Sequence, residues 1–269
     1  RSIAIGAGAL FAQNPASATD MYNVGIGYEA GVAVTTATRD TLIGGLAGDA
    51  LTTGSYNVAV GYTSLGATTT GASNVAVGDA ALSSNTTAGS NTAVGAAALA
   101  ANTTGSYSTA VGQNALTAAT TGGYNTAVGQ GALAATTTGA TNVAVGVDAL
   151  VTNTTASNNT AVGYIALKMN TTGADNVAVG KGALTANTTG TLNVSVGKNS
   201  MEANTTGANN TAVGRESLAS NTTADNNVAV GYNSLLVNTT GTNNVAVGAN
   251  TLDANTTGGD NTGLGRGAL

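Results

Sequence analysis

The sequence contains no cysteine, no histidine and no tryptophan, and it has one proline and one phenylalanine among its 269 residues. Without cysteine the chain has no disulfide bridge, no thiolate metal site and no cysteine nucleophile. Without histidine it lacks the base of the common Ser-His-Asp and Cys-His catalytic arrangements. These absences lead us to expect a protein that is not an enzyme and that carries no cofactor.

Charge is also scarce, since charged residues make up 7% of the chain, whereas about 25% is usual. The formal net charge is −5, so the lysine and arginine footprint that a nucleic acid requires is missing. No apolar run reaches the length of about 18 residues that a membrane span needs. No secretory leader is visible, but the chain starts at Arg1 and both ends fall within a repeat. We therefore expect a segment of a longer protein.

Glycine, alanine, threonine and asparagine fill most of the chain with a strict period. The glycine that closes each A-V-G triplet or its equivalent stands at Gly27, Gly44 and Gly61. It recurs every 17 residues as far as Gly265. A further copy, S-I-A-I-G with Gly6, lies 21 residues before Gly27. This first unit therefore carries four extra residues, in the stretch that holds Phe11 and Pro15. A repeat that places valine and leucine at fixed intervals argues against a disordered chain.

The repeat unit reads N-[VT]-A-V-G-x-x-[AS]-L-x-x-N-T-T-G-x-x, and we number its positions one to seventeen. β-Branched residues at positions two and four suit a strand. Glycine at position five permits the turn that ends the strand, and N-T-T-G favours another turn in which threonine hydroxyls satisfy backbone groups. Repeated Thr-Thr and glycine disfavour a helix. The pattern predicts an all-β fold, a parallel β-solenoid with one coil per 17-residue repeat.

Side chains alternate between the two faces of a strand, so positions two and four share one face and position three takes the other. We expect the valine face to join the leucine of position nine in the coil interior. The alanine of position three should then point outward, where it would allow close contact with a neighbouring chain. Asparagines at positions one and twelve should form ladders of amide hydrogen bonds. The N-T-T triplets also match a glycosylation sequon, but the ladder explains them without glycans.

The repeat divides the chain into two regions of different regularity. Residues 1–54 are expected to form irregular N-terminal coils, with the four-residue insertion making a loop or bulge around Asn14 and Pro15. Residues 55–269 are expected to form one continuous solenoid of regular 17-residue coils. No acidic position recurs along the array, so a calcium-binding solenoid or another metal site is not expected.

The unit N-V-A-V-G-x-x-A-L-x-x-N-T-T-G resembles the head repeats of YadA-like trimeric autotransporter adhesins, and S-I-A-I-G-A-G-A-L at residues 2–10 is close to their strand motif. It is also similar to the N-T-A-V-G-x-x-A-L repeats of phage-type tail fibres. The resemblance covers essentially the whole chain, although YadA-type units are shorter and lack a regular N-T-T-G. It implies a left-handed parallel β-roll in which three chains pack side by side.

These observations predict a non-enzymatic structural shaft or head of a trimeric surface fibre used for attachment, either a phage tail fibre or a bacterial adhesin. Such a segment would lie outside the cell, at a cell surface or on a virion, and would form a homotrimer. Its contact would be a glycan or a protein of the host or cell surface. The alternative is an ice-binding or glycan-binding β-solenoid module. Ice binding is disfavoured because the adjacent threonines of N-T-T would face opposite ways in a strand.

The tyrosines are the residues best suited to contact a partner, because each combines an apolar ring with a polar tip. All of them fall at position six or seventeen, at the two ends of the strand. Simple coverage of the coil edge is the competing interpretation. The eight tyrosines are Tyr22, Tyr28, Tyr56, Tyr62, Tyr107, Tyr124, Tyr164 and Tyr232.

Overall fold

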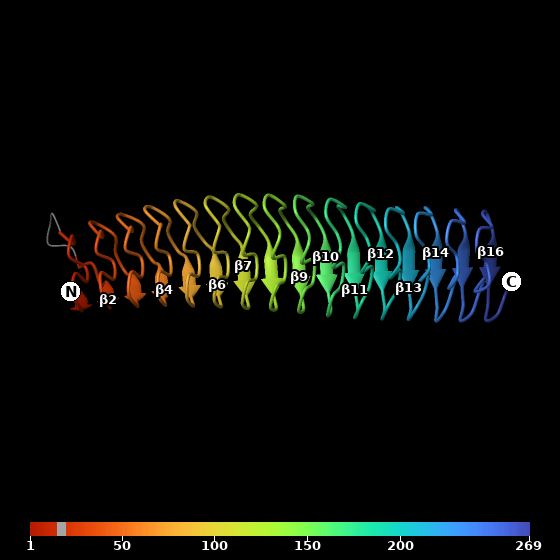
Figure 1. Ribbon diagram of the computed structural model, residues 1–269, viewed down its shortest axis with the longest axis horizontal. Helices are drawn as coiled ribbons and strands as arrows, with labels where there is room; N and C mark the ends of the chain where they lie inside the picture. Colours follow the sequence, from red (N-terminus) through yellow and green to blue (C-terminus); the bar gives the residue numbers. More distant parts are fainter. Residues whose placement is uncertain (15–19) are drawn as a thin grey trace. The chain divides into compact units, whose positions relative to one another are not determined.

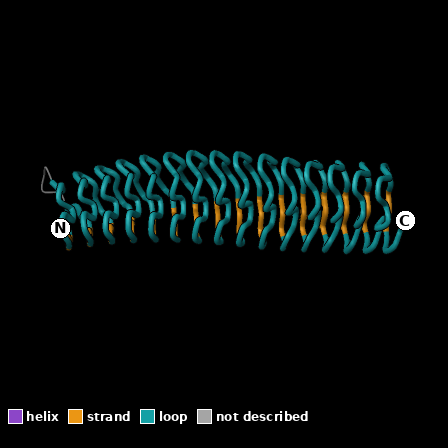
Figure 2. The backbone as a smooth tube through the Cα atoms, viewed as in Figure 1, coloured by secondary structure: helices purple, strands orange, loops and turns teal. Residues whose placement is uncertain are grey.

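The computed structural model describes residues 1–14 and 20–269. The loop or bulge predicted around Asn14 and Pro15 therefore falls largely outside the described residues. The chain divides into two compact units, Arg1–Thr138 and Gly139–Leu269. In both units the described residues form short strands joined by turns and loops and contain no helix, as Figure 2 shows with strands in orange and loops in teal. The predicted all-β class is confirmed.

Among the described residues of the first unit, eight three-residue strands pair in parallel, in chain order (Figure 1). Equivalent residues of successive repeats lie opposite each other, as Thr92 lies opposite Thr109. Ile3 lies opposite Val24, so the extra residues of the first repeat fall between strands and leave the register intact. The strands are β1 (Ile3–Ile5), β2 (Val24–Ile26), β3 (Thr41–Ile43), β4 (Val58–Val60), β5 (Val75–Val77), β6 (Thr92–Val94), β7 (Thr109–Val111) and β8 (Thr126–Val128).

The second unit repeats the same arrangement with eight more parallel strands in chain order. Here too each residue lies opposite its equivalent in the next repeat, as Val177 lies opposite Val194. The strands are β9 (Val143–Val145), β10 (Thr160–Val162), β11 (Val177–Val179), β12 (Val194–Val196), β13 (Thr211–Val213), β14 (Val228–Val230), β15 (Val245–Val247) and β16 (Thr262–Leu264).

Each unit is a parallel β-solenoid, because successive coils are bonded to each other outside the strands as well. The backbone N–H of Leu99 donates to the carbonyl of Ala115, 3.0 Å away, and that of Thr103 donates to Thr120 at 2.9 Å. Buried backbone groups require such partners, and here the next coil supplies them. The predicted arrangement, with one coil per repeat, is therefore confirmed in both units.

The prediction of which strand face lies inside the coil was wrong. Ala127 at position three is completely buried, whereas Val128 at position four is 37% exposed. The leucine of position nine is buried as well, as at Leu116, so it packs on the alanine side of the strand. The reason is space: a Cβ placed on Gly263, at position three, would lie 3.1 Å from Cγ of Leu252. A coil this narrow accommodates the leucine only if the strand residue facing it is small.

One exception supports this explanation. Leu42 occupies position three in β3 and is completely buried. The residues at position nine of the two nearest coils are Gly31 and Gly48 instead of leucine. A Cβ on Gly31 would lie 2.5 Å from Cδ1 of Leu42, and one on Gly48 would lie 2.9 Å from its Cδ2. In this part of the solenoid the large side chain belongs to the strand and the small residue to the turn. The volume of the interior is therefore preserved.

The backbone reverses direction at positions that the consensus identifies only in part. Glycine at position five has a positive φ, and a Cβ on Gly44 would lie 2.5 Å from the carbonyl oxygen of Gly61, so only glycine fits. The leucine of position nine also has a positive φ, 52° at Leu116. Left-handed geometry costs a non-glycine residue about 1–2 kcal/mol, and burial of the leucine side chain offsets this cost.

Candidate functional site

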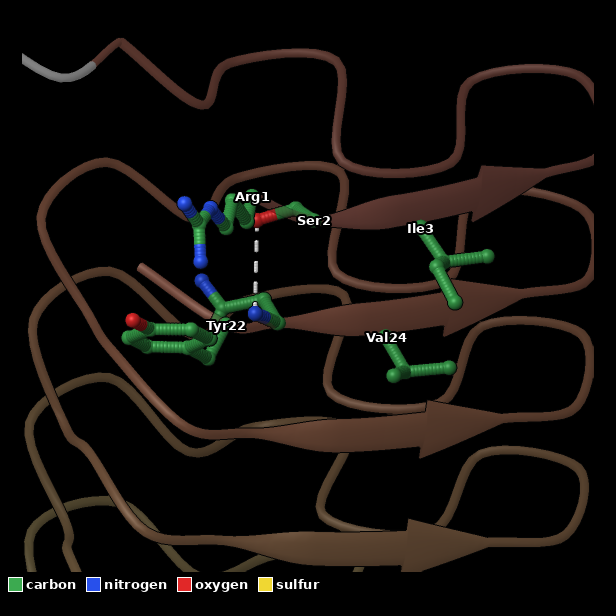
Figure 3. A pocket seen from close by; sticks show the side chains of 6 residues that line it. Arg1, Ser2, Ile3, Tyr22 and Val24 are labelled. Atoms are coloured by element: carbon green, nitrogen blue, oxygen red, sulfur yellow. Dashed lines mark hydrogen bonds between the residues drawn. The ribbon is translucent and has the colours of Figure 1, made fainter. Parts of the chain in front are cut away.

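Each unit has an outer strand face, which we define as the side chains at positions two and four of its strands. It contains only valine, isoleucine and threonine, with Leu264 as the one exception, and it carries no charge. Figure 3 shows Ile3 and Val24, from position two of β1 and β2, projecting from the same side of the sheet. Their outward direction reverses the predicted arrangement, because the face expected inside the coil is the one exposed to solvent.

A shallow hollow lies at the start of this face. The residues that line it are Arg1, Ser2, Ile3, Tyr22, Asn23 and Val24. The backbone N–H of Asn23 donates to the hydroxyl of Ser2 over 3.3 Å, which ties the first two coils together (Figure 3). The hollow contains no set of groups for acid–base or nucleophilic chemistry, so we regard it as the edge of the outer strand face.

The interior is lined by two ladders of buried asparagine, as predicted. At position twelve, the Asn187 side-chain amide donates to the side-chain oxygen of Asn170 at 2.8 Å and to the carbonyl of Gly190 at 3.0 Å. At position one, the Asn176 amide donates to the same Gly190 carbonyl at 2.8 Å. The two ladders thus hold the N-T-T-G turn from both sides. The position-twelve asparagines of the N-T-T sequons are occupied in this way and are buried in all but the last of the coils, so the fold leaves them closed to glycan addition.

Replacing Asn187 with alanine should lower the free energy of unfolding by about 2–3 kcal/mol. The loss arises because the Asn204 amide would lose its acceptor, the Asn187 oxygen 3.0 Å away, inside the coil. The control is Thr189→Ala, on the exposed turn of the same repeat. Chemical denaturation of the two variants and the wild type measures the effect. Equal stability of the two variants would contradict a structural role for the ladder.

All eight tyrosines lie on the surface, with 45–62% of their area exposed. The structure brings the rings of Tyr107 and Tyr124 together in a stack, with centroids 5.0 Å apart and planes 16° from parallel. Arg39 lies over the ring of Tyr56, with its Cζ 5.3 Å from the centroid. Tyr56 and Tyr62 lie at opposite ends of β4. The tyrosines therefore form separate small groups along the strand ends, and no single pocket collects them.

Two of these phenols are held by neighbouring acids. The hydroxyl of Tyr22 donates to a carboxylate oxygen of Asp20 at 3.0 Å, and this hydrogen bond raises the pKa of Tyr22. A hydrogen bond to Glu29 likewise raises the pKa of Tyr28. Both phenols therefore keep their protons to a higher pH than an ordinary tyrosine, and the protonated hydroxyl is a hydrogen-bond donor.

Asp40 is a functional candidate that the sequence pattern did not single out. It replaces asparagine at position one, and it is completely buried. One carboxylate oxygen accepts the backbone N–H of Asn57 at 2.8 Å, while Oδ2 has no partner. Burial raises the pKa of Asp40 to about 7. The sequence could have indicated this residue, because Asp40 is the one acidic residue at a position that is otherwise mostly asparagine.

A second feature that the sequence reasoning missed is a cluster of basic residues at position six of three consecutive repeats, Lys181, Lys198 and Arg215. In the part of the chain that the structure describes, no three histidine, cysteine, aspartate or glutamate side chains gather as metal ligands. Within the same residues, no helix has the length and apolar character to cross a membrane.

Comparison with known proteins finds no counterpart for this arrangement. No known family model matches the chain, no curated protein matches it, and no solved structure matches it. The function proposed below therefore rests on the geometry of the two solenoid units.

Proposed function

We propose that the chain is a structural, non-enzymatic segment of a surface fibre, in which copies of the chain associate side by side through the outer strand face. The observation that carries the proposal is the uncharged outer strand face, in which each strand turns two β-branched or apolar side chains away from the coil interior. Parallel sheets almost always have both faces covered, and large exposed apolar patches mark interaction sites. In each unit one face of the sheet is covered by the coil's own leucines, and the other is open.

A second copy of the chain is the partner that fits this face. The side chains of the face repeat with the spacing of the coils, and another copy would present rows with the same spacing. The interior of each coil is thin, because it consists of alanine, leucine and asparagine, so association would add apolar burial that one chain lacks. In an assembly with closed symmetry, every copy makes the same contacts. We propose an assembly of three copies. It would lie outside the cell and serve in attachment.

The mass of the chain in solution, measured by light scattering, tests the proposal. We expect three times the chain mass of 25.6 kDa for the wild type. The double variant Val111→Asp and Val128→Asp places charges on the outer strand face of adjacent coils, so it should run at the single-chain mass with its β-structure retained. The control is Thr104→Asp with Thr121→Asp, which adds the same charge on exposed turns. A monomeric wild type, or a valine variant that still associates, would refute the proposal.

Ice binding is the second candidate, and the regular outward rows of threonine and valine favour it. In β7, Thr109 and Val111 both point outward, and the pattern recurs along the unit. The threonines of N-T-T contribute less, because the Thr188 hydroxyl is bound to the carbonyl of Thr205 at 3.0 Å. A monomeric wild type that shows thermal hysteresis would favour this function over the fibre.

A further inference from the structure

Three successive coils of the second unit carry a positive charge at the same place, position six, directly after the glycine that ends the strand. We name Lys181, Lys198 and Arg215 the basic row, and all three side chains are exposed. They follow the parallel strands β11, β12 and β13, which pair in register. Neighbouring strands lie about 4.8 Å apart, so the three positions recur at about this interval along the coil stack. Of the chain's seven basic residues, these three are consecutive at one position.

Such a row is unfavourable unless something negative lies against it. Like charges on adjacent strands destabilise a sheet. Arg215 has an acidic partner, since its Nη2 lies 3.0 Å from a carboxylate oxygen of Glu216. Among the described residues, neither Lys181 nor Lys198 forms an ion pair. The chain therefore leaves most of the charge of the row unneutralised, although its net charge is −5.

Aromatic rings lie at both ends of the basic row. The Nζ of Lys181 is 5.8 Å from the ring centroid of Tyr164, and the Cζ of Arg215 is 5.5 Å from that of Tyr232. Both tyrosines also occupy position six, and both rings are about half exposed. Cation–π contacts hold the terminal cations in place. The surface is thus a line of five side chains, ring–cation–cation–cation–ring.

Association between copies of the chain does not explain the row. Consider the arrangement in which position six of one copy meets position seventeen of the next at the same level, at the opposite end of the strand. The residue at position seventeen is Asp175 for the strand of Lys181, but Leu192 and Asn209 for the strands of Lys198 and Arg215. A neighbouring copy would therefore neutralise one cation of the three.

We propose that the basic row binds a linear anionic polysaccharide that lies along the coil stack. Its carboxylate or sulfate groups would pair with the three cations, and its sugar rings would pack on Tyr164 and Tyr232. A chain with regularly spaced charges fits a row with regularly spaced cations. A nucleic acid fits less well, because it requires a broader basic surface, and an anionic membrane fits less well because the row is one residue wide and has Glu216 beside it.

Isothermal titration of the full chain with heparin and with polygalacturonate, using dextran as the uncharged control, tests the proposal. We expect binding of at least one anionic polysaccharide that weakens as salt is added, and none of dextran. Lys181→Gln with Lys198→Gln should weaken binding by about tenfold for each lysine removed. The control Lys168→Gln with Arg266→Gln removes the same charge from the same unit outside the row, and it should bind as the wild type does.

Several results would overturn the proposal. They are equal loss of affinity in both double variants, equal binding of dextran, and tighter binding of a single-stranded oligonucleotide or of phosphatidylserine vesicles. An unchanged melting curve for the Lys181/Lys198 variant would show that the coil is folded. If its melting temperature is lowered, Tyr232→Leu is used instead. That variant should weaken polysaccharide binding while the melting curve is retained. The inference is independent of the proposed fibre, because polysaccharide binding is measured whatever the mass of the assembly.

Discussion

Ala127→Asp should unfold the coil that contains it, whereas Val128→Asp should leave that coil folded. The two residues are neighbours in β8, but Ala127 is completely buried and Val128 is 37% exposed. A carboxylate at position 127 would enter an interior of leucine and alanine, at a cost of several kcal/mol. A carboxylate at position 128 would point into solvent, and the single chain would lose only the strand preference of valine, about 1 kcal/mol.

Amide hydrogen exchange measures this contrast coil by coil. In a solenoid each repeat contacts only its neighbours, so the damage from Ala127→Asp should be confined to β8 and the adjoining coils. Protection in β1 to β4 should stay at the wild-type level and serves as the internal control. Loss of protection caused by Val128→Asp and not by Ala127→Asp would mean that the strand faces are assigned the wrong way round.

Asp40→Asn should stabilise the first unit by about 4 kcal/mol more at pH 8 than near pH 3. The ordinary pKa of this carboxyl is 3.8, and burial raises it to about 7 in the folded chain. Between these values the unfolded chain loses the proton while the folded chain keeps it, so the wild type loses stability as pH rises from about 4 to about 7. Each unit of pKa shift corresponds to about 1.4 kcal/mol. Asparagine does not titrate and has no such loss.

Asparagine also supplies the donor that this position requires. In the adjacent coils, the Asn23 amide donates to the carbonyl of Ala37 at 2.7 Å, and the Asn57 amide donates to that of Gly71 at 3.0 Å. By the same spacing, the carbonyl of Gly54 would accept a hydrogen bond from the side chain of residue 40. Oδ2 of Asp40 has no partner. The asparagine variant is therefore expected to complete the ladder.

Urea unfolding of wild type and variant between pH 3 and pH 8 tests this prediction. Asp79→Asn, which removes an acid from the exposed position six of the same unit, is the matched control and should follow the wild-type curve. If Asp40→Asn follows the wild-type curve as well, burial does not raise the pKa of Asp40, and the assigned geometry of position one is wrong.

Part of the candidate site could be predicted from the sequence. The tyrosines were expected at the strand ends, and all eight are exposed there. The basic row was not anticipated, because its charges looked scattered until parallel pairing brought Lys181, Lys198 and Arg215 to one level on adjacent strands. Asp40 was not anticipated either, since its environment depends on the ladder that buries it.

The coil follows from the sequence alone, because a short strict repeat with one strand triplet, β-branched at both ends, and one closing glycine permits a parallel solenoid and little else. So do the asparagine ladders, because identical residues are stacked in register. Which strand face lies inside depends on the packing of the folded coil. Alternation along a strand separates Ala127 from Val128 but does not say which of them faces inward. The volume of the leucine at position nine decides that question, because a narrow coil has room opposite it for alanine and not for valine.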